Sequence, residues 1–347
     1  MPDVIEIDGG YGESGGQILR TSVALSAVTN KPFKIFNIRK GRCVGGIRPQ
    51  HLEAIKSVAK LCSAELKGAE VGSCELDFRP KALRSGQIDI NIPTAGSVGL
   101  VLQGLMIAAA HVEEKIVIKI EGGATSGKWA APVNYIRCVL LQTLEKMGYE
   151  AGLEIEKYGY YPKGGARVSM WINPCRLQPL QLIEQGKVLE IFGLSHASQH
   201  LENAKVAERQ KDAADGLLYD EYQIPPKIEV KYVDTVCPGS AIDLWLRTDS
   251  SVMGSEGLGE RGKTAEKVGT EAAKLLIKQV ESKAPLDIHV ADQILPYIAF
   301  AAEHGPSHVR VAEITGHCKT NIWVIEKFLP VKFRIDEKKK IISCRKI

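Results

Sequence analysis

The order of predicted elements repeats along this chain, and this repetition limits the possible folds more than any single motif does. The first copy contains, in order, a strand at 4–8, a helix at 17–28, a strand at 33–38, a helix from about 49, and two strands at 64–66 and 74–78. Apolar periodicity supports these assignments, which give the order β-α-β-α-β-β. Nearly the same order returns after roughly 80 residues, so we interpret it as a repeated module.

The second and third copies follow the same plan. The second contains a strand at 87–92, a helix at 100–110, a strand at 115–120, a helix beginning at Pro132, and strands at 151–156 and 166–171. Its first helix is almost entirely apolar, so we expect it to be buried on all sides. Residues 286–344 supply most of a third copy, including a helix predicted at 294–302 after Asp292, and a second helix that follows His317 and ends at Pro330.

An additional segment lies between the second and third copies. It contains a strand at 188–194, a helix at 201–218, strands at 227–233 and 241–246, and a helix at 263–281. We therefore predict an α/β (α+β) protein with two domains. The large domain comprises 1–185 and 284–347, with modules at about 4–80, 86–173 and 284–347, and residues 186–283 form a small α/β insert domain. A chain of 347 residues suits this division.

Composition narrows the setting in which the protein works. A hydrophobic content of 44% with 25% charged residues is ordinary for a soluble globular protein. No apolar run reaches membrane-spanning length, so we expect neither a signal peptide, a transmembrane helix nor a membrane partner. The eight cysteines include no CxxC pair, which indicates free thiols in a reducing cytoplasm. A net charge of +4 permits a phosphate-bearing partner without requiring one.

Several loops between strands and helices carry residues suited to chemistry. If the modules pack around a pseudo-threefold axis, equivalent loops converge. The first loops carry Glu13, Ser97 and Asp292, and the second carry Arg39, Arg42, His51, Lys128, Pro132 and His317. Helix N-termini with arginines, a histidine and carboxylates suit a phosphorylated substrate and a divalent metal. The alternative is that glycine-rich loops form tight turns with solvated charges, and the residues alone support both equally.

Three stretches resemble the RNA 3′-terminal phosphate cyclase family closely. They are residues 8–20, 46–52 and 317–322, and further similarity lies at 95–103, 158–165 and 259–263. The resemblance extends in the same order from about Ile5 to Leu329. It implies three βαβαββ modules with a small thioredoxin-like insert.

The resemblance also implies a reaction and the residues that perform it. A histidine attacks the α-phosphorus of ATP, the AMP passes to an RNA 3′-phosphate, and the vicinal 2′-oxygen closes a 2′,3′-cyclic phosphate with release of AMP. His317 matches the nucleophile, and Glu13 matches a ligand for Mg²⁺ or Mn²⁺. Arg20, Arg39 and Arg42 match the residues that neutralise phosphate charge. The remaining matches, to residues that line the nucleotide site, are Gln50, His51, Gln103, Pro132 and Asp292.

This sequence departs from the family pattern in two places. Ala166 replaces the last glycine of a glycine-rich signature, which would strain a turn that needs positive φ. His289 stands where some members have an aromatic residue, three positions before Asp292, so stacking on adenine is in doubt there.

Other interpretations remain open at this stage. The first is a non-catalytic relative that serves ribosomal RNA maturation, although such relatives lack the nucleophile. The second is a carbon-transfer enzyme with similar modules. The third is a P-loop ATPase that uses Lys263, because residues 257–264 match G-x4-G-K-T. Residues 250–256 are not expected to form the buried strand that a P-loop requires. The sequence leaves open whether the chain forms a homo-oligomer.

Two further patterns carry little weight. Tyr158, Tyr160 and Tyr161 could stack on RNA bases, but aromatic residues beside a glycine turn more often pack locally. His196/His200 and His304/His308 have i, i+4 spacing without lying on one helical face, so we do not expect a zinc site.

Overall fold

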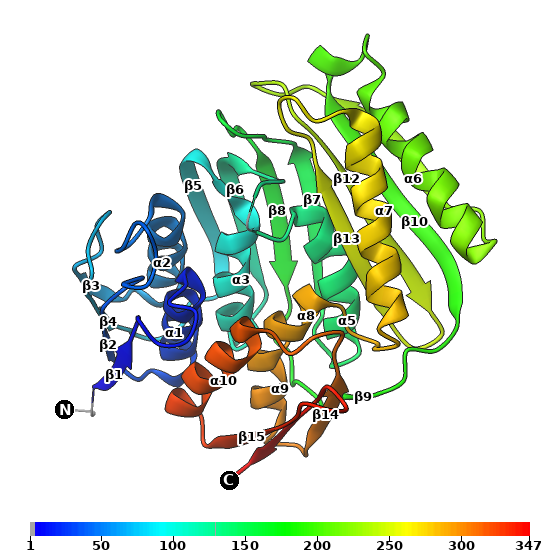
Figure 1. The fold of residues 1–347 in the computed structure, drawn as a ribbon. Helices are drawn as coiled ribbons and strands as arrows, with labels where there is room; N and C mark the ends of the chain where they lie inside the picture. The colour runs from blue at the N-terminus through cyan, green and yellow to red at the C-terminus, as the bar shows by residue number, and fades with distance from the viewer. Residues whose placement is uncertain (1–3, 129) are drawn as a thin grey trace.

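The computed structural model describes residues 4–128 and 130–347 and forms a mixed α/β protein. Residues 1–3, which the predicted large domain includes, lie outside the described residues. Within the described part, the strands form four sheets of four strands each. Figure 1 shows three of these sheets from left to right and the sheet with β14 and β15 below them, with α10 lying next to α1.

Three of the sheets have the same strand order. The first sheet contains β1 (Ile5–Asp8), β2 (Phe33–Phe36), β4 (Leu76–Arg79) and β3 (Glu65–Lys67), in that spatial order. The second contains β5 (Gly86–Ser97), β6 (Ile116–Ala124), β8 (Arg167–Ile172) and β7 (Ala151–Lys157). The third contains β9 (Gln181–Leu182), β14 (Ser307–Arg310), β16 (Ile341–Lys346) and β15 (Val331–Asp336). In each sheet the first two strands are parallel and the other neighbours are antiparallel.

Helices from different sheets pack against one another. They are α1 (Gly16–Thr29), α2 (Pro49–Cys62), α3 (Val98–Ala109), α4 (Val133–Tyr135), the π-helical η1 (Ile136–Leu140), α5 (Leu141–Glu145), α8 (Ile288–Gln293), α9 (Leu295–Ala301) and α10 (Gly316–Phe328). Helix α1 contacts α2, α3 and α10. All residues of α3 except Gln103 are buried, which confirms the expected burial of this apolar helix.

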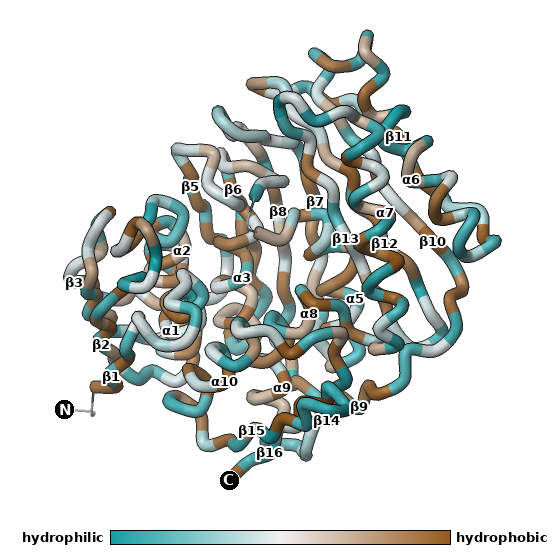
Figure 2. Tube along the Cα trace, viewed as in Figure 1, coloured by the Kyte–Doolittle hydropathy of each residue, from teal (hydrophilic) through white to brown (hydrophobic). Residues whose placement is uncertain are grey.

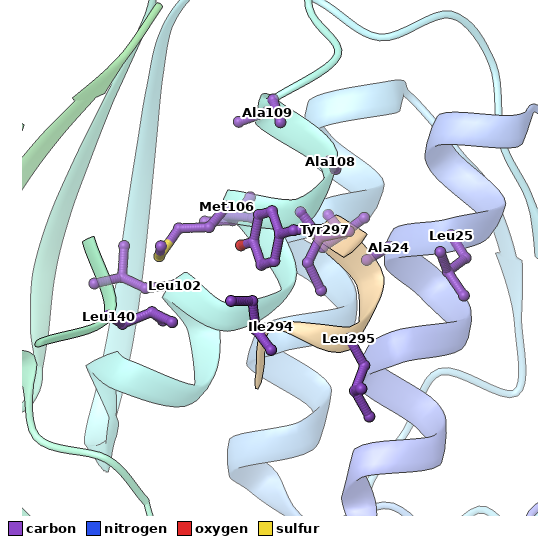
Figure 3. Close-up of a cluster of buried hydrophobic side chains, with 14 of the residues drawn as sticks. Ala24, Leu25, Leu102, Met106, Ala108, Ala109, Leu140, Ile294, Leu295 and Tyr297 are labelled. Atoms are coloured by element: carbon purple, nitrogen blue, oxygen red, sulfur yellow. The ribbon is translucent and has the colours of Figure 1, made fainter. Parts of the chain in front are cut away.

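The hydrophobic core joins these helices into one unit. Figure 3 shows Leu25 from α1, Met106 from α3 and Tyr297 from α9 in one cluster, and all three are buried. The strands contribute by strict alternation, since Ile88, Ile90 and Ile92 of β5 are buried while the residues between them are exposed. Figure 2 shows apolar residues concentrated in the strands and inner helices.

The fourth sheet is formed by residues between β9 and α8. It contains β11 (Lys227–Val233), β10 (Val188–Ser198), β12 (Ser240–Thr248) and β13 (Val252–Leu258), in that spatial order. Helices α6 (Val206–Tyr222) and α7 (Ala265–Glu281) pack on it, and the short 3₁₀ helix η2 (Gln199–Leu201) follows β10. A separate cluster of buried side chains, including Leu218, Leu244 and Leu276, forms its core.

A buried polar network connects this fourth sheet to the second. The Tyr160 hydroxyl lies 2.5 Å from His196 Nδ1, and His196 Nε2 lies 3.0 Å from Asp243 Oδ2. Asn134 Nδ2 donates to the same Asp243 oxygen at 2.7 Å. A separate contact connects the fourth sheet to the start of α8, where Gly254 N of β13 donates to Asp287 Oδ2 at 2.9 Å.

The structure corrects two predicted elements. The helix expected at 294–302 is present as α9, but a separate short helix, α8, precedes it, because the Asp287 side chain accepts from His289 N and Val290 N and caps α8. Asp292 therefore lies inside a helix. Residues 252–258 form strand β13, so the expectation that no strand precedes the Gly259–Thr264 loop was wrong. Among the described residues, none of the helices combines the length and apolar character required to cross a lipid bilayer.

Candidate functional site

His317 is the second residue of α10, and its imidazole pairs with Glu13. Thr315 caps the helix, since its Oγ1 accepts from Cys318 N at 3.2 Å. His317 Nδ1 lies 3.0 Å from Glu13 Oε2, and about half of the His317 side chain is exposed. When the Glu13 carboxylate accepts a hydrogen bond from Nδ1–H of the neutral imidazole, Nε2 carries no proton and keeps its lone pair. This contact therefore orients the imidazole and selects the tautomer in which Nε2 can act as a nucleophile.

Glycines allow the Glu13 loop to approach α10 closely. A Cβ on Gly316 would lie 2.3 Å from Glu13 Oε1. Gly12 has φ +55°, and a Cβ there would lie 2.4 Å from Thr320 Oγ1. A side chain at Gly316 would displace the Glu13 carboxylate, and one at Gly12 would meet Thr320, so these glycines allow the close approach of Glu13 to His317.

The loop after β2 brings arginines to the same place. Arg42 Nη2 lies 3.8 Å from Glu13 Oε2. A Cβ built on Gly15 would lie 3.4 Å from Arg42 and 3.9 Å from His317, so this glycine lies between the two side chains. Arg39 adopts φ +59°, which only a minority of non-glycine residues do, and its Nε is buried without a hydrogen-bond partner. Burial, then Arg42 and Arg48, lowers the pKa of Arg39. A bound anion would accept hydrogen bonds from Arg39 and offset the repulsion between these arginines.

His51 lies under the N-terminus of α1. Its side chain is buried, and Nδ1 accepts from Arg48 N at 3.3 Å. Burial first, then Arg20, Arg39 and Arg48, lowers the pKa of His51 to about 3. His51 is therefore neutral at physiological pH, and Nε2 carries the proton because Nδ1 accepts. Nε2 lies close to Gly16, where a Cβ would be only 2.1 Å away from it.

A small cavity of about 30 Å³ brings together residues from the helices of three sheets. Its lining includes the predicted site residues Arg20, Gln103 and Asp292. Burial raises the pKa of Asp292 to about 6, although His317, His289 and Arg20 oppose this increase. Burial likewise lowers the pKa of Arg20 to about 10, with Asp292 acting in the other direction. The two groups are opposite charges held in a poorly solvated space.

The sequence interpretation did not single out three residues that support Asp292. Gln17 Nε2 donates to Asp292 Oδ2 at 2.5 Å, and Asn321 Nδ2 donates to Asp292 O at 2.8 Å. Thr21 Oγ1 donates to Asn321 Oδ1 at 2.7 Å. The sequence does contain a signal, because Gln17/Thr21 and His317/Asn321 are i, i+4 pairs that each share a helical face. Their pairing across two helices has no sequence signature.

Not every predicted residue joins this group. Pro132 and Lys128 line a second cavity of about 180 Å³ against β13 and α7, where Lys128 Nζ lies 2.7 Å from Glu260 Oε2. Gln50 lies beside Gly96, and Ser97 caps α3 by accepting from Leu100 N at 3.2 Å. Among the described residues, no hydrogen bond or ion pair connects Lys128 or Pro132 to His317.

The other sequence patterns have structural explanations. Lys263 pairs with Glu271 at 2.5 Å, and Thr264 Oγ1 caps α7 by accepting from Lys267 N. β13 is paired antiparallel to β12, unlike the strand of a P-loop. Tyr158 and Tyr160 are buried, whereas Tyr161 is exposed. In the part of the chain that the structure describes, no group of three His, Cys, Asp or Glu side chains is arranged to hold a metal ion.

Comparison with known proteins gives one consistent result. The family model described as "RNA 3′-terminal phosphate cyclase" matches residues 11–335. Three similar proteins bear that same name. The protein of Pyrococcus abyssi is 43% identical over 96% of this chain and 95% of its own length. The Methanosarcina acetivorans protein is 42% identical over 96% and 98%, and the Thermococcus kodakarensis protein is 44% identical over 96% and 94%.

Proposed function

Because this chain belongs to the RNA 3′-terminal phosphate cyclase family, we propose that it is an ATP-dependent cyclase of RNA 3′-phosphates. Its relatives are named as enzymes, and the chain is accordingly an enzyme. One observation carries the proposal furthest: the contact of 3.0 Å between His317 Nδ1 and Glu13 Oε2, with Arg42 beside it. The same contact argues against a non-catalytic factor in ribosomal RNA maturation, which would have no use for an oriented nucleophile.

In the first step, His317 Nε2 attacks the α-phosphorus of ATP. An N–P bond forms, the bond from the α-phosphorus to its bridging oxygen breaks, and diphosphate leaves. Positive charge develops on the imidazole, and the Glu13 carboxylate at Nδ1 stabilises it. Arg42 and Arg39 would neutralise the phosphate oxygens.

In the second step, an oxygen of the RNA 3′-phosphate attacks the phosphorus of the bound AMP and the N–P bond breaks. His317 is thereby released in its neutral form. In the third step, the vicinal 2′-oxygen attacks the RNA phosphorus, AMP leaves, and the 2′,3′-cyclic phosphate forms. The freed Nε2 would take the proton from the 2′-hydroxyl as the ring closes.

The residues near His317 fit a divalent metal that is bound partly by substrate. Mg²⁺ is usually held by one or two carboxylates together with phosphate oxygens, and Glu13 offers one such carboxylate. Mg²⁺ or Mn²⁺ held there would neutralise charge on the ATP phosphates. Gln103, Asp292, Gln50, His51 and Pro132 remain our candidates for lining the nucleotide site, and Arg20 remains a candidate for neutralising phosphate charge. Pro132 is the least supported, because it lines the other cavity.

The finer architecture belongs to the same proposal. We propose three βαβαββ modules around a pseudo-threefold axis, with the large domain at 1–185 and 284–347. The shared order β1-β2-β4-β3, β5-β6-β8-β7 and β9-β14-β16-β15 supports this. Residues 186–283 would form the thioredoxin-like insert, supported by the order β11-β10-β12-β13 and its two helices. Eight free thiols support a cytoplasmic location, and homo-oligomer formation stays open.

Labelling the protein with ATP tests the nucleophile. We expect ATP carrying a radioactive α-phosphate, with Mg²⁺ or Mn²⁺, to leave an acid-labile, alkali-stable label on the wild-type protein. His317→Ala should take up none, and γ-labelled ATP should label neither protein. Lys263→Ala is the matched control and should be labelled like wild type, because Lys263 pairs with Glu271. Label on His317→Ala would refute the nucleophile, and loss of label in Lys263→Ala would favour the P-loop.

A further inference from the structure

Tyr11 is an exposed aromatic residue in the same loop as Glu13. Its ring stacks on the indole of Trp323 with centroids 4.1 Å apart and an interplanar angle of 12°. Trp323 belongs to α10, and Lys327 Nζ lies 5.5 Å from its ring. Tyr11 nevertheless remains 44% exposed. One face of the tyrosine ring is therefore covered by Trp323 and the other is available.

The position of this ring is fixed by the loop that carries it. Ser14 N donates to Tyr11 O at 2.9 Å, and Tyr11 N donates to Asp8 O at 3.2 Å. Gly12, the next residue, packs against Thr320 of α10. Tyr11 and Glu13 are two positions apart, so their Cα atoms lie within about 7 Å of each other. The exposed ring is held within one nucleotide's reach of the group that orients His317.

Positive charge lies on the loop that packs beside the Tyr11 loop. The loop of Tyr11 packs along the loop that contains Arg39, Lys40 and Arg42. A Cβ on Gly10 would lie 3.8 Å from Lys40 Cβ, and Gly41 N donates to Ser14 Oγ at 3.0 Å. Lys40 and Arg42 are exposed. An aromatic platform beside a basic loop is the combination that binds single-stranded nucleic acid, because bases stack while phosphates pair with the cations.

We propose that Tyr11, supported by Trp323, stacks on the base of the terminal nucleotide of the RNA substrate. The inference rests on the proposed function, since the terminal phosphate of that nucleotide would lie at His317 and the arginines. Stacking accepts any base, because every base has a π face. The contact therefore explains how an enzyme could hold RNA ends of different sequence in one position. Trp323 acts as a positioning residue, because its indole fixes the orientation of the tyrosine ring.

The test measures binding of a short oligoribonucleotide with a 3′-phosphate, by fluorescence anisotropy without ATP. We expect Tyr11→Leu, which keeps apolar bulk over Trp323, to weaken binding by about ten-fold, the scale of one stacked base. Tyr11→Phe should retain wild-type affinity. Tyr219→Ala is the matched control, because Tyr219 is 47% exposed on α6, at the far end of the molecule in Figure 1.

A second RNA makes the test specific to the base. Removing the terminal base, while keeping its ribose and 3′-phosphate, should weaken binding to wild type by a similar factor. It should have little further effect on Tyr11→Leu. The proposal is overturned if Tyr11→Leu binds like wild type, if its loss persists on the abasic RNA, or if only removal of the penultimate base matters. Failure of the wild type to label with ATP or to cyclise RNA would instead contradict the proposed function.

Discussion

The Glu13 carboxylate is the residue at which loops from distant parts of the sequence meet. It contacts Nδ1 of His317 and lies near the Arg42 guanidinium, so side chains from two other segments reach the same carboxylate. A carboxylate in this position orients the histidine and can also hold a metal ion with the substrate. The two roles are separable, because the amide oxygen of a glutamine can accept a hydrogen bond from Nδ1–H but binds Mg²⁺ weakly.

Replacing Glu13 by glutamine should therefore affect metal use. We expect Glu13→Gln to slow adenylylation of His317 by about a hundred-fold and to raise the metal concentration needed for half-maximal rate. The measurement is the initial rate of labelling from α-labelled ATP across a metal titration. Glu266→Gln is the control, since Glu266 pairs with Arg209 on the insert. An unchanged metal dependence would exclude Glu13 as the ligand.

A second residue-scale prediction concerns Glu256 on β13. Burial raises the pKa of its carboxyl group to about 7, with Asp243 and Asp287 adding to the increase and His289 opposing it, and Oε2 has no hydrogen-bond partner. Below about pH 4.5 the folded and unfolded states both hold this proton. Between about pH 4.5 and 7 the unfolded state releases it first, so this group costs up to about 3 kcal/mol of stability as pH rises.

Glu256→Gln should remove that pH dependence. We compare the free energy of unfolding of the variant with that of wild type. This difference should be more favourable to the variant at pH 8 than at pH 5, by up to about 3 kcal/mol. Urea unfolding at the two pH values measures the difference. Parallel pH profiles for the two proteins would show that Glu256 does not titrate in this range.

At the scale of elements, glycines at the starts of helices determine how closely the loops approach. Gly16 begins α1 directly over the buried His51, and Gly316 begins α10 over Glu13. These helix N-termini direct backbone N–H groups and neutral donors toward one region, as phosphate sites commonly do. The site is therefore built from helix starts, and side-chain volume at those starts is restricted.

Alanine at Gly16 should disrupt the site. Its Cβ would lie 2.1 Å from His51 Nε2, so the imidazole or the helix must move. We expect Gly16→Ala to lose about 1–3 kcal/mol of stability and to label poorly with ATP. Gly216→Ala on α6 is the control, because no atom lies within 4 Å of its Cβ position. Gly216→Ala should increase the free energy of unfolding by roughly 0.5–1 kcal/mol, because alanine favours the helix more than glycine does. Thermal unfolding of both variants measures the contrast, and equal effects would contradict it.

Elements and short-range signals could be predicted from the sequence, and contacts between distant segments could not. The alternation of Ile88, Ile90 and Ile92 identified β5, and the apolar run identified α3. Asp292 was placed before a helix because the cap at Asp287, five residues earlier, was not recognised. β13 was missed because its glycines and serines obscure the strand pattern, although its partners in the sheet bury it.

The site shows the same division. The family motifs singled out His317, Glu13 and the arginines, and the structure brings Glu13, Arg42 and His317 together. The bond from Gln17 to Asp292 joins residues 275 positions apart, and no local pattern specifies such a pair. Pro132 was grouped with these residues because its loop is equivalent to theirs, but it lines the cavity against the insert.

At the scale of the whole molecule, the fourth sheet is attached to the rest of the chain through buried polar groups as well as apolar contacts. The network of Tyr160, His196, Asp243 and Asn134 crosses between the second and fourth sheets. His196 is fully buried. Such a network fixes relative orientation when every member has a partner, and is costly when one is removed.

Removing His196 should loosen the attachment. We expect His196→Leu to leave the Tyr160 hydroxyl and the Asp243 carboxylate without their shared partner, and to cost about 3 kcal/mol. Thermal unfolding gives the loss, and limited proteolysis should cut the variant near residues 183–187 or 282–286 before wild type. His200→Leu is the matched control, because His200 is exposed next to the same strand. Equal stability of His196→Leu and wild type would show that apolar packing alone holds the insert.

The position of β9 also determines when the protein becomes complete during synthesis. Gln181 in β9 pairs with His308 in β14, and all strands of the fourth sheet lie between them in the sequence. A ribosome therefore releases the first two sheets, then the fourth, and only afterwards the segment that completes the third sheet. His317 emerges last of the residues around Glu13. A nascent or truncated chain would carry Glu13 and the arginines but lack His317, so under the proposed function it could not react with ATP until residue 317 has been made.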